Sequence, residues 1–253
     1  MDPRTVRAGH GWTWIIQGYA LFRKSPANWL ALILLLFAAT KLLGMVPLLG
    51  IVFLLLMPIF IVGLMEGCRA LERGEPLQLA HLAAGFRRNA AQLVTIGGVS
   101  LVGNLVIMMI VVSLGGDAML AMAKTFGEGG TAAVSPELKV AIVRALLVGM
   151  VVSLPLLMAL WYAPLLIYFH ELGPVAALRS SLVACLKNAP ALLVYGLAVF
   201  AGTFIAMPFA IALRQYDIAL WLLAPVLLPS LYASYKDIYL AGAAPEPGAA
   251  PTV

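Results

Sequence analysis

The chain contains apolar runs that are long enough to cross a membrane, and this feature limits its fold more than any other. A helix needs about 20 mostly apolar residues to span the hydrocarbon core of a bilayer. The runs are continuously apolar and lack the alternation of a lipid-facing barrel strand, so they are predicted to be helices. The expected spans are a block from Trp29 to Met65 that turns within Lys41–Gly50 and so holds two spans, then Ala91–Leu114, Val140–Phe169, Pro190–Leu213 and Ile218–Tyr232.

The composition places nearly the whole chain in the bilayer. Hydrophobic residues make up 63% of the 253 residues and charged residues 11%, whereas soluble domains are about one quarter charged. We therefore predict an all-α polytopic membrane protein with about six transmembrane helices in a single domain, residues 1–240. The first run begins after Pro26 and lacks a small-residue cleavage site, so we expect a retained span rather than a signal peptide. Residues 241–253, rich in Ala, Pro and Gly, are expected to be disordered.

The distribution of basic residues predicts the orientation of the chain, because short cytoplasmic loops carry an excess of Lys and Arg. With six spans, 11 of the 16 basic residues fall on the side of the N-terminus. They are Arg4, Arg7, Arg23, Lys24, Arg69, Arg73, Arg87, Arg88, Arg179, Lys187 and Lys236. We expect both termini in the cytoplasm and the loop Gly115–Lys139 outside. The same bias explains the net charge of +5, so no nucleic-acid partner is predicted.

Three stretches pass from basic residues into an apolar span in the same way: FRKSP at Phe22–Pro26, FRRNA at Phe86–Ala90 and LKNAP at Leu186–Pro190. Ser25 and Asn89 are expected to cap the helices that follow, because short polar side chains accept hydrogen bonds from the first free N–H groups. The chain then divides into three repeat-like hairpins, at about 10–74, 75–171 and 172–240. The alternative is that such transitions recur in any polytopic protein without being homologous repeats.

Each transition follows a segment with the period of a helix. The apolar positions are Trp14, Ile15, Gly18, Tyr19 and Phe22, then Leu79, Leu82, Ala83 and Phe86, then Val175, Leu178, Leu182 and Leu186. The segments are too short and polar to span, so we expect interfacial amphipathic helices in the headgroup plane. The alternative is a set of loop helices packed on the bundle. The return spans end alike, in Glu66, Glu171 and Asp237, and we expect these acids at similar depth, each beside a Lys or Arg.

Three stretches carry a resemblance to a known family. They are GWTWIIQGYALFRKSPANW (Gly11–Trp29), AALRSSLVACLKNAPALLVYG (Ala176–Gly196) and LYASYKDIY (Leu231–Tyr239). Over roughly Gly11 to Tyr239 the chain resembles an uncharacterised family of six-span inner-membrane proteins of Gram-negative bacteria. The resemblance implies a location and an architecture, and it implies no activity.

Few residues offer catalytic or metal chemistry. His10, His81 and His170 do not form an HExxH arrangement, and the chain has neither a nucleophile elbow nor a phosphate-binding loop. Cys68 and Cys185 are expected to be packing residues near the cytoplasmic face, where disulfides are disfavoured. We therefore predict no catalytic residue, no metal site and no cofactor.

Polar and small residues within the spans favour helix packing. Ser100 and Asn104 lie one turn apart and are expected to bond a neighbouring helix, and a stripe of small residues on the fifth span is typical of helix contacts. The stripe is Ala198, Gly202, Ala206 and Ala210. The candidate structural polar residues are Glu66, Asn104, Glu171 and Asp237.

Two classes of function are favoured, and a membrane-embedded enzyme is a third alternative. Charge-poor spans favour a scaffold or regulatory component of the cell envelope, whereas spans broken by proline favour a carrier or channel for a small amphiphile or lipid. The expected partners are membrane lipids and other membrane proteins. Anionic phospholipid is expected at a basic collar, the alternative being a topology signal without bound lipid. The collar consists of Arg23, Lys24, Arg87, Arg88 and Lys187.

Overall fold

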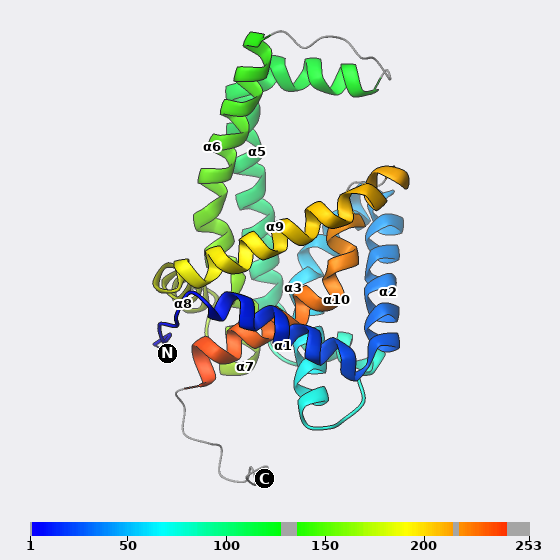
Figure 1. The fold of residues 1–253 in the computed structure, drawn as a ribbon, viewed down its shortest axis with the longest axis vertical. Coiled ribbons are helices and arrows are strands. Elements are labelled where there is room, and N and C mark those ends of the chain that lie inside the picture. Colours follow the sequence, from blue (N-terminus) through cyan, green and yellow to red (C-terminus); the bar gives the residue numbers. More distant parts are fainter. Residues whose placement is uncertain (1, 128–135, 215–217, 242–253) are drawn as a thin grey trace.

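The structure, a computed structural model, describes residues 2–127, 136–214 and 218–241 (Figure 1). Its regular elements are helical, and no strand occurs in these ranges. They are α1 (His10–Lys24), α2 (Pro26–Gly44), α3 (Pro47–Glu72), the 3-10 turn η1 (Leu79–Ala83), α4 (Ala84–Arg87), α5 (Ala90–Gly127), α6 (Pro136–Trp161), α7 (Ala163–His170), α8 (Pro174–Lys187), α9 (Ala189–Ala212), α10 (Ile218–Tyr235) and the π-helix η2 (Lys236–Leu240). The predicted all-α fold is confirmed.

Six segments of the described residues are long and apolar enough to cross a membrane, as predicted. They are Pro26–Gly44, Pro47–Glu72, Ala90–Gly116, Lys139–His170, Ala189–Ala212 and Ile218–Leu240. The first two meet at Met45 and Val46, inside the expected turn. The sixth runs beyond its predicted end at Tyr232 because the polar residues that follow continue as η2. The division into three hairpins stays a prediction, and the predicted tail lies largely outside the described residues.

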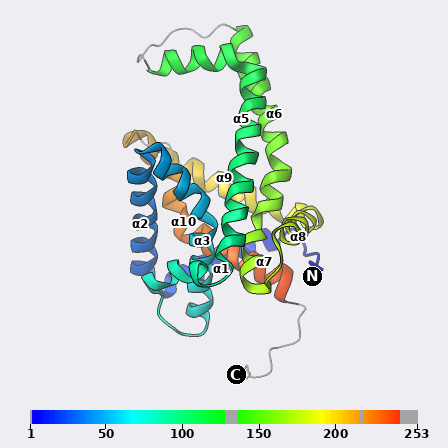
Figure 2. The same cartoon turned by 180° about the vertical axis from the view of Figure 1, so that it is seen from behind.

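The spans do not form one uniform bundle. In both views α5 and α6 run side by side and extend past the other spans, and α5 turns aside at Gly115, where the backbone leaves helical geometry (Figures 1 and 2). α3 packs against α2 and α5, while α10 packs against α9 and α1. The buried core therefore lies at the end of the molecule where α1, α3, α7 and α10 meet.

The helix α1 is part of this core. A Cβ at Gly11 would lie 2.1 Å from the carbonyl oxygen of Ala191, and one at Gly18 would lie 2.6 Å from that of Val226. Only glycine allows the backbones to approach this closely. Between them, Trp14 is completely buried. One face of α1 thus packs on α9 and α10, as the packed alternative requires, and an interfacial location for its other face stays a prediction.

The other two expected amphipathic segments differ from the sequence pattern. The second is a 3-10 turn and one short helix, in which Leu82 is buried but Leu79 and Phe86 are exposed. The third is the helix α8, but Val175 and Leu186 of its predicted apolar face are 80% and 59% exposed. α8 instead buries its small residues, which are Ala177, Ser181, Ala184 and Cys185.

The predicted caps at the helix junctions are wrong, although the breaks fall where they were expected. Ser25 makes no side-chain hydrogen bond at the start of α2. Asn89, which has a positive φ of 59°, donates its amide to the carbonyl of Ile167 at 3.0 Å. The Ile167 carbonyl also accepts a hydrogen bond from the Glu171 N–H at 3.1 Å, so Asn89 adds a second donor at the end of α7 instead of bonding an N–H of its own helix.

Candidate functional site

The three stretches that carry the family resemblance meet at one end of the molecule, around the carboxylate of Asp237. They are Gly11–Trp29, Ala176–Gly196 and Leu231–Tyr239. Asp237 lies in η2, and its Oδ1 accepts a hydrogen bond from Arg4 Nη2 at 2.5 Å. Its Oδ2 lies 2.6 Å from His10 Nδ1 and accepts a hydrogen bond from Trp14 Nε1 at 2.8 Å. One carboxylate thus joins the N-terminal segment, α1 and the end of the last span.

Asn188, at the start of α9, holds the N-terminal segment on its other side. This completely buried side chain accepts a hydrogen bond from the Val6 N–H at 2.8 Å. It donates to the carbonyls of Arg4 and Ala184, both at 2.9 Å. The Arg4 N–H also donates to the carbonyl of Ile238. Residues 4–6 are therefore fixed between α9 and η2.

A second ion pair joins the end of α3 to the end of the last span. Lys236 Nζ lies 2.6 Å from Glu72 Oε1, and the Tyr232 hydroxyl donates to Glu72 Oε2 at 3.2 Å. Lys24, the last residue of α1, donates to the carbonyl of Leu71 at 3.0 Å. α1 is thus attached near both of its ends to α3 and η2.

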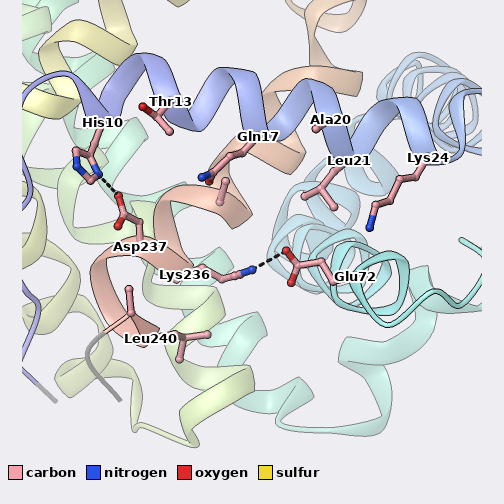
Figure 3. A pocket seen from close by; sticks show the side chains of 12 residues that line it. His10, Thr13, Gln17, Ala20, Leu21, Lys24, Glu72, Lys236, Asp237 and Leu240 are labelled. Atoms are coloured by element: carbon pink, nitrogen blue, oxygen red, sulfur yellow. Dashed lines mark hydrogen bonds and ion pairs between the residues drawn. The ribbon is translucent and has the colours of Figure 1, made fainter. Parts of the chain in front are cut away.

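A groove of about 570 Å³ lies between these two ion pairs, beneath α1. In Figure 3, His10 and Asp237 lie at one end of the groove and Lys24 lies at the other, while Lys236 extends from beside Asp237 toward Glu72. The remaining lining residues are Thr13, Gln17, Ala20, Leu21, Ala233, Leu240 and Ala241. Gln17 projects from α1 toward the groove (Figure 3). The groove offers hydrogen-bonding and charged groups of both signs, which suits a polar or zwitterionic surface of a partner.

The serine hydroxyl of Ser181 completes a broken helix. It accepts a hydrogen bond from the Tyr162 N–H at 2.9 Å and donates to the Met158 carbonyl at 2.7 Å. These two backbone groups are four residues apart, the spacing of a helical hydrogen bond. The hydroxyl, which is completely buried, therefore stands inside the hydrogen-bond ladder between α6 and α7. A side chain of α8 thus bridges the junction between α6 and α7.

The tyrosine hydroxyls of LYASYKDIY (Leu231–Tyr239) also form hydrogen bonds with other helices. Tyr235 bonds His170 Nε2 at 2.7 Å, and Tyr239 donates to the Ser180 carbonyl at 3.1 Å. Ser234 accepts a hydrogen bond from Tyr162 at 3.2 Å. This stretch therefore connects α3, α7, α8 and α1. No single motif in the sequence indicated this convergence; the only signal was that polar residues cluster in otherwise apolar stretches.

The five residues of the predicted basic collar lie against different parts of the protein. Lys24 contacts α3 as described, Arg88 pairs with Glu171, and Lys187 Nζ lies 2.8 Å from Asp2 Oδ1. The hydrogen bond with Glu171 raises the pKa of the Arg88 guanidinium, and the hydrogen bond from Lys187 lowers the pKa of Asp2. Among the described residues, the other two bases, Arg23 and Arg87, form no ion pair. Arg23 lies over the Tyr19 ring at 6.0 Å from its centroid.

The three acids at the ends of the return spans each have an arginine neighbour. Glu66 Oε2 lies 3.9 Å from Arg69 Nη1 and receives no hydrogen bond within the described residues. Glu171 pairs with Arg88 and Asp237 with Arg4 and His10. The expectation of similar membrane depth stays a prediction.

Among the described residues, the side chain of Asn104 bonds only its own helix, so the prediction of a bond to a neighbouring helix is wrong. Its Nδ2 donates to the Ser100 carbonyl at 2.7 Å and lies 3.4 Å from the Ser100 hydroxyl, both within α5. Gly97, two turns before Asn104 on α5, allows a close approach to α3, since a Cβ there would lie 2.1 Å from the Leu55 carbonyl oxygen. Two residues of the small stripe, Ala206 and Ala210, are buried against Ala219 of α10.

The fold and the polar network define a polytopic helical membrane protein whose N-terminal segment is attached to its last span. The chain is 31% identical to a protein of Burkholderia thailandensis named "probable inner membrane protein", over an alignment of 265 residues that covers 96% of this chain and 95% of that protein. The chain belongs to the same family and is a multi-pass protein of the inner membrane. No family model matches the chain, and no solved structure matches it.

Proposed function

We propose that the protein is a non-catalytic scaffold or regulatory component of the cell envelope, with both termini in the cytoplasm. The observation that supports this most is the use of its charged residues. Asp237 and Glu72 accept hydrogen bonds from groups of four different segments, so they stabilise one arrangement of the chain. The groove between them then forms a rigid polar surface on the proposed cytoplasmic side, suited to a partner protein.

A carrier for an amphiphile requires a polar cavity that runs from one face of the membrane toward its middle. The groove is lined by α1 and by the ends of α3 and the last span. A second cavity lies between α3, α5 and the α6–α7 pair, and it shares no lining residue with the groove. This separation favours the scaffold over the carrier.

The scaffold is tested by affinity purification in mild detergent with mass spectrometry of the proteins that co-purify. Gln17→Arg places a cation in the groove without removing a member of either ion pair. The matched control is Glu75→Arg, which adds a cation in an exposed loop outside the groove. A partner that docks in the groove co-purifies with the wild type and the control but is depleted with Gln17→Arg. Equal recovery in all three, or no partner near a 1:1 ratio, contradicts the proposal.

Anionic phospholipid is proposed as a second partner, at Arg23 and Arg87, because the other bases of the collar contact protein groups. A base near an anionic leaflet attracts lipid by about 1 kcal/mol. Replacing both by glutamine is expected to reduce the anionic lipid that co-purifies, in protein whose topology is unchanged. Lipid retention equal to that of the wild type would show that these bases act only as a topology signal.

A further inference from the structure

The cavity between α3, α5 and the α6–α7 pair has a volume of about 310 Å³ and no ionisable residue in its lining. We propose that this cleft binds the hydroxyl end of an uncharged membrane amphiphile, a lipid-phase molecule with one polar group and a long apolar chain. The site is separate from the groove under α1, and the inference does not depend on the proposed scaffold role. It depends on three hydrogen-bonding groups that line the cleft.

The first group is the side chain of Asn104. It is exposed near the middle of the 27-residue span of α5 and lines the cleft. Its amide nitrogen donates within the helix to Ser100, but its Oδ1 receives no hydrogen bond from any described residue. A polar group without a partner is costly in hydrocarbon, where no water replaces the missing bond. An acceptor at this depth therefore favours a ligand that brings a donor.

The other two groups are backbone carbonyls. Pro58 and Pro164 have no N–H, so the carbonyls of Leu54 and Leu160, four residues earlier, lose their usual helical donors. All four residues line the same cleft. No side chain of the described residues donates to either carbonyl. Two segments from distant parts of the chain thus each contribute to this lining a proline and the residue whose carbonyl that proline deprives of a donor.

These features define the chemical class of the ligand. Three acceptors that receive no hydrogen bond from a described side chain favour a ligand with a donor, and a lining without ionisable residues favours a neutral one. A hydroxyl meets both conditions. The volume is at the lower end of small-molecule sites, which hold about 300–1,000 Å³. The cleft therefore takes the polar end and the adjoining carbons, and the remaining chain lies in the bilayer beside α3, where Leu54 is 51% exposed.

Photolabelling of the full-length protein in nanodiscs of phosphatidylethanolamine and phosphatidylglycerol tests the proposal. The probe is hexadecanol with a diazirine a few carbons from the hydroxyl, and the control probe is the corresponding hexadecane. We expect peptides of α3 and α5 that line the cleft to be labelled by the alcohol and much less by the alkane. Asn104→Leu is expected to reduce this labelling about fivefold, the effect of one hydrogen bond of ordinary strength. Thr95→Val is the matched control, because the only described group that the Thr95 hydroxyl bonds is the Ala91 carbonyl of its own helix, and Thr95 lies outside the cleft.

A competition experiment distinguishes two kinds of molecule that could provide the hydroxyl, a long-chain alcohol and a diacylglycerol. Unlabelled hexadecanol and dioleoylglycerol are each added in excess, and displacement by either supports the proposal and shows which type of molecule fits. Equal labelling by alcohol and alkane overturns it, as does failure of both competitors. A change from dimer to monomer in Asn104→Leu overturns it as well, because Asn104 would then bond a second copy. If the variant does not fold, the comparison of the two probes on the wild type still decides the matter.

Discussion

Replacing Ser181 by alanine tests whether a single hydroxyl holds the junction of α6 and α7. In the folded protein this hydroxyl bridges the Tyr162 N–H and the Met158 carbonyl, at 2.9 and 2.7 Å. Both Ser181 and Tyr162 are completely buried. Ser181→Ala therefore leaves the Tyr162 N–H without its partner in a buried site, and leaves the Met158 carbonyl with only the weak donor Cys185 Sγ, at 3.4 Å.

The loss of stability depends on whether the Tyr162 N–H and the Met158 carbonyl find new hydrogen-bond partners in the variant. A buried group left without its hydrogen bond costs about 1–3 kcal/mol. Because the two groups are four residues apart, they recover part of this cost if the helix straightens and they bond each other directly. We therefore expect Ser181→Ala to lower the free energy of unfolding by about 1–3 kcal/mol, rather than by the full cost of two unpaired groups.

Unfolding by sodium dodecyl sulfate in mixed micelles measures the free energy, and hydrogen exchange of the Tyr162 amide reports the broken bond directly. Ser153→Ala is the matched control, since within the described residues that hydroxyl bonds only the Met150 carbonyl of its own helix. Its loss is expected to change stability by less than about 0.5 kcal/mol. Ser181→Cys keeps a weak hydrogen-bonding group and should lie between the two. If Ser181→Ala is as stable as Ser153→Ala and its Tyr162 amide exchanges no faster than in the wild type, the bridging role of the hydroxyl is refuted.

Three further predictions concern the two ends of the chain and a buried thiol. Asp237→Asn weakens the contacts that hold the N-terminal segment, so we expect a loss of about 1–2 kcal/mol and faster tryptic cleavage after Arg7; an unchanged cleavage rate would contradict this. Burial raises the pKa of the Cys185 thiol to about 12, so thiolate forms only well above neutral pH, and iodoacetamide at pH 8 is expected to modify it only after denaturation, as measured by mass spectrometry. Reporter fusions at Glu128 and Val253 should give opposite locations, and the same location for both would exclude six spans.

The spans could be predicted from the sequence because their length and composition are local properties. The apolar runs, and the glycine and proline residues between them, place each span close to its observed bounds. The end of the last span was missed for a physical reason. Lys236 and Asp237 resemble the start of a polar loop, but their charges are paired with Glu72 and Arg4, so the chain continues as a π-helix.

The buried face of α8 could not be predicted by looking for large apolar residues. That rule depends on water, which drives apolar side chains inside. Lipid is as apolar as leucine, so helices in a membrane associate through small residues and hydrogen bonds instead. Val175 and Leu186 are accordingly exposed, and Ala177, Ser181 and Ala184 are buried. The small-residue stripe of α9, which was selected by this second rule, does contain buried positions.

The polar network could not be predicted from the sequence for a different reason. Its residues lie far apart along the chain. Asp237 bonds Arg4 across 233 residues and Trp14 across 223. No spacing rule relates positions so far apart, and each residue alone has an ordinary explanation as a loop charge or an interfacial aromatic. What the sequence did show is that three apolar stretches contain more polar residues than lipid contact allows. Such residues are costly unless they find partners, so their presence indicates a meeting point even where it does not identify the pairs.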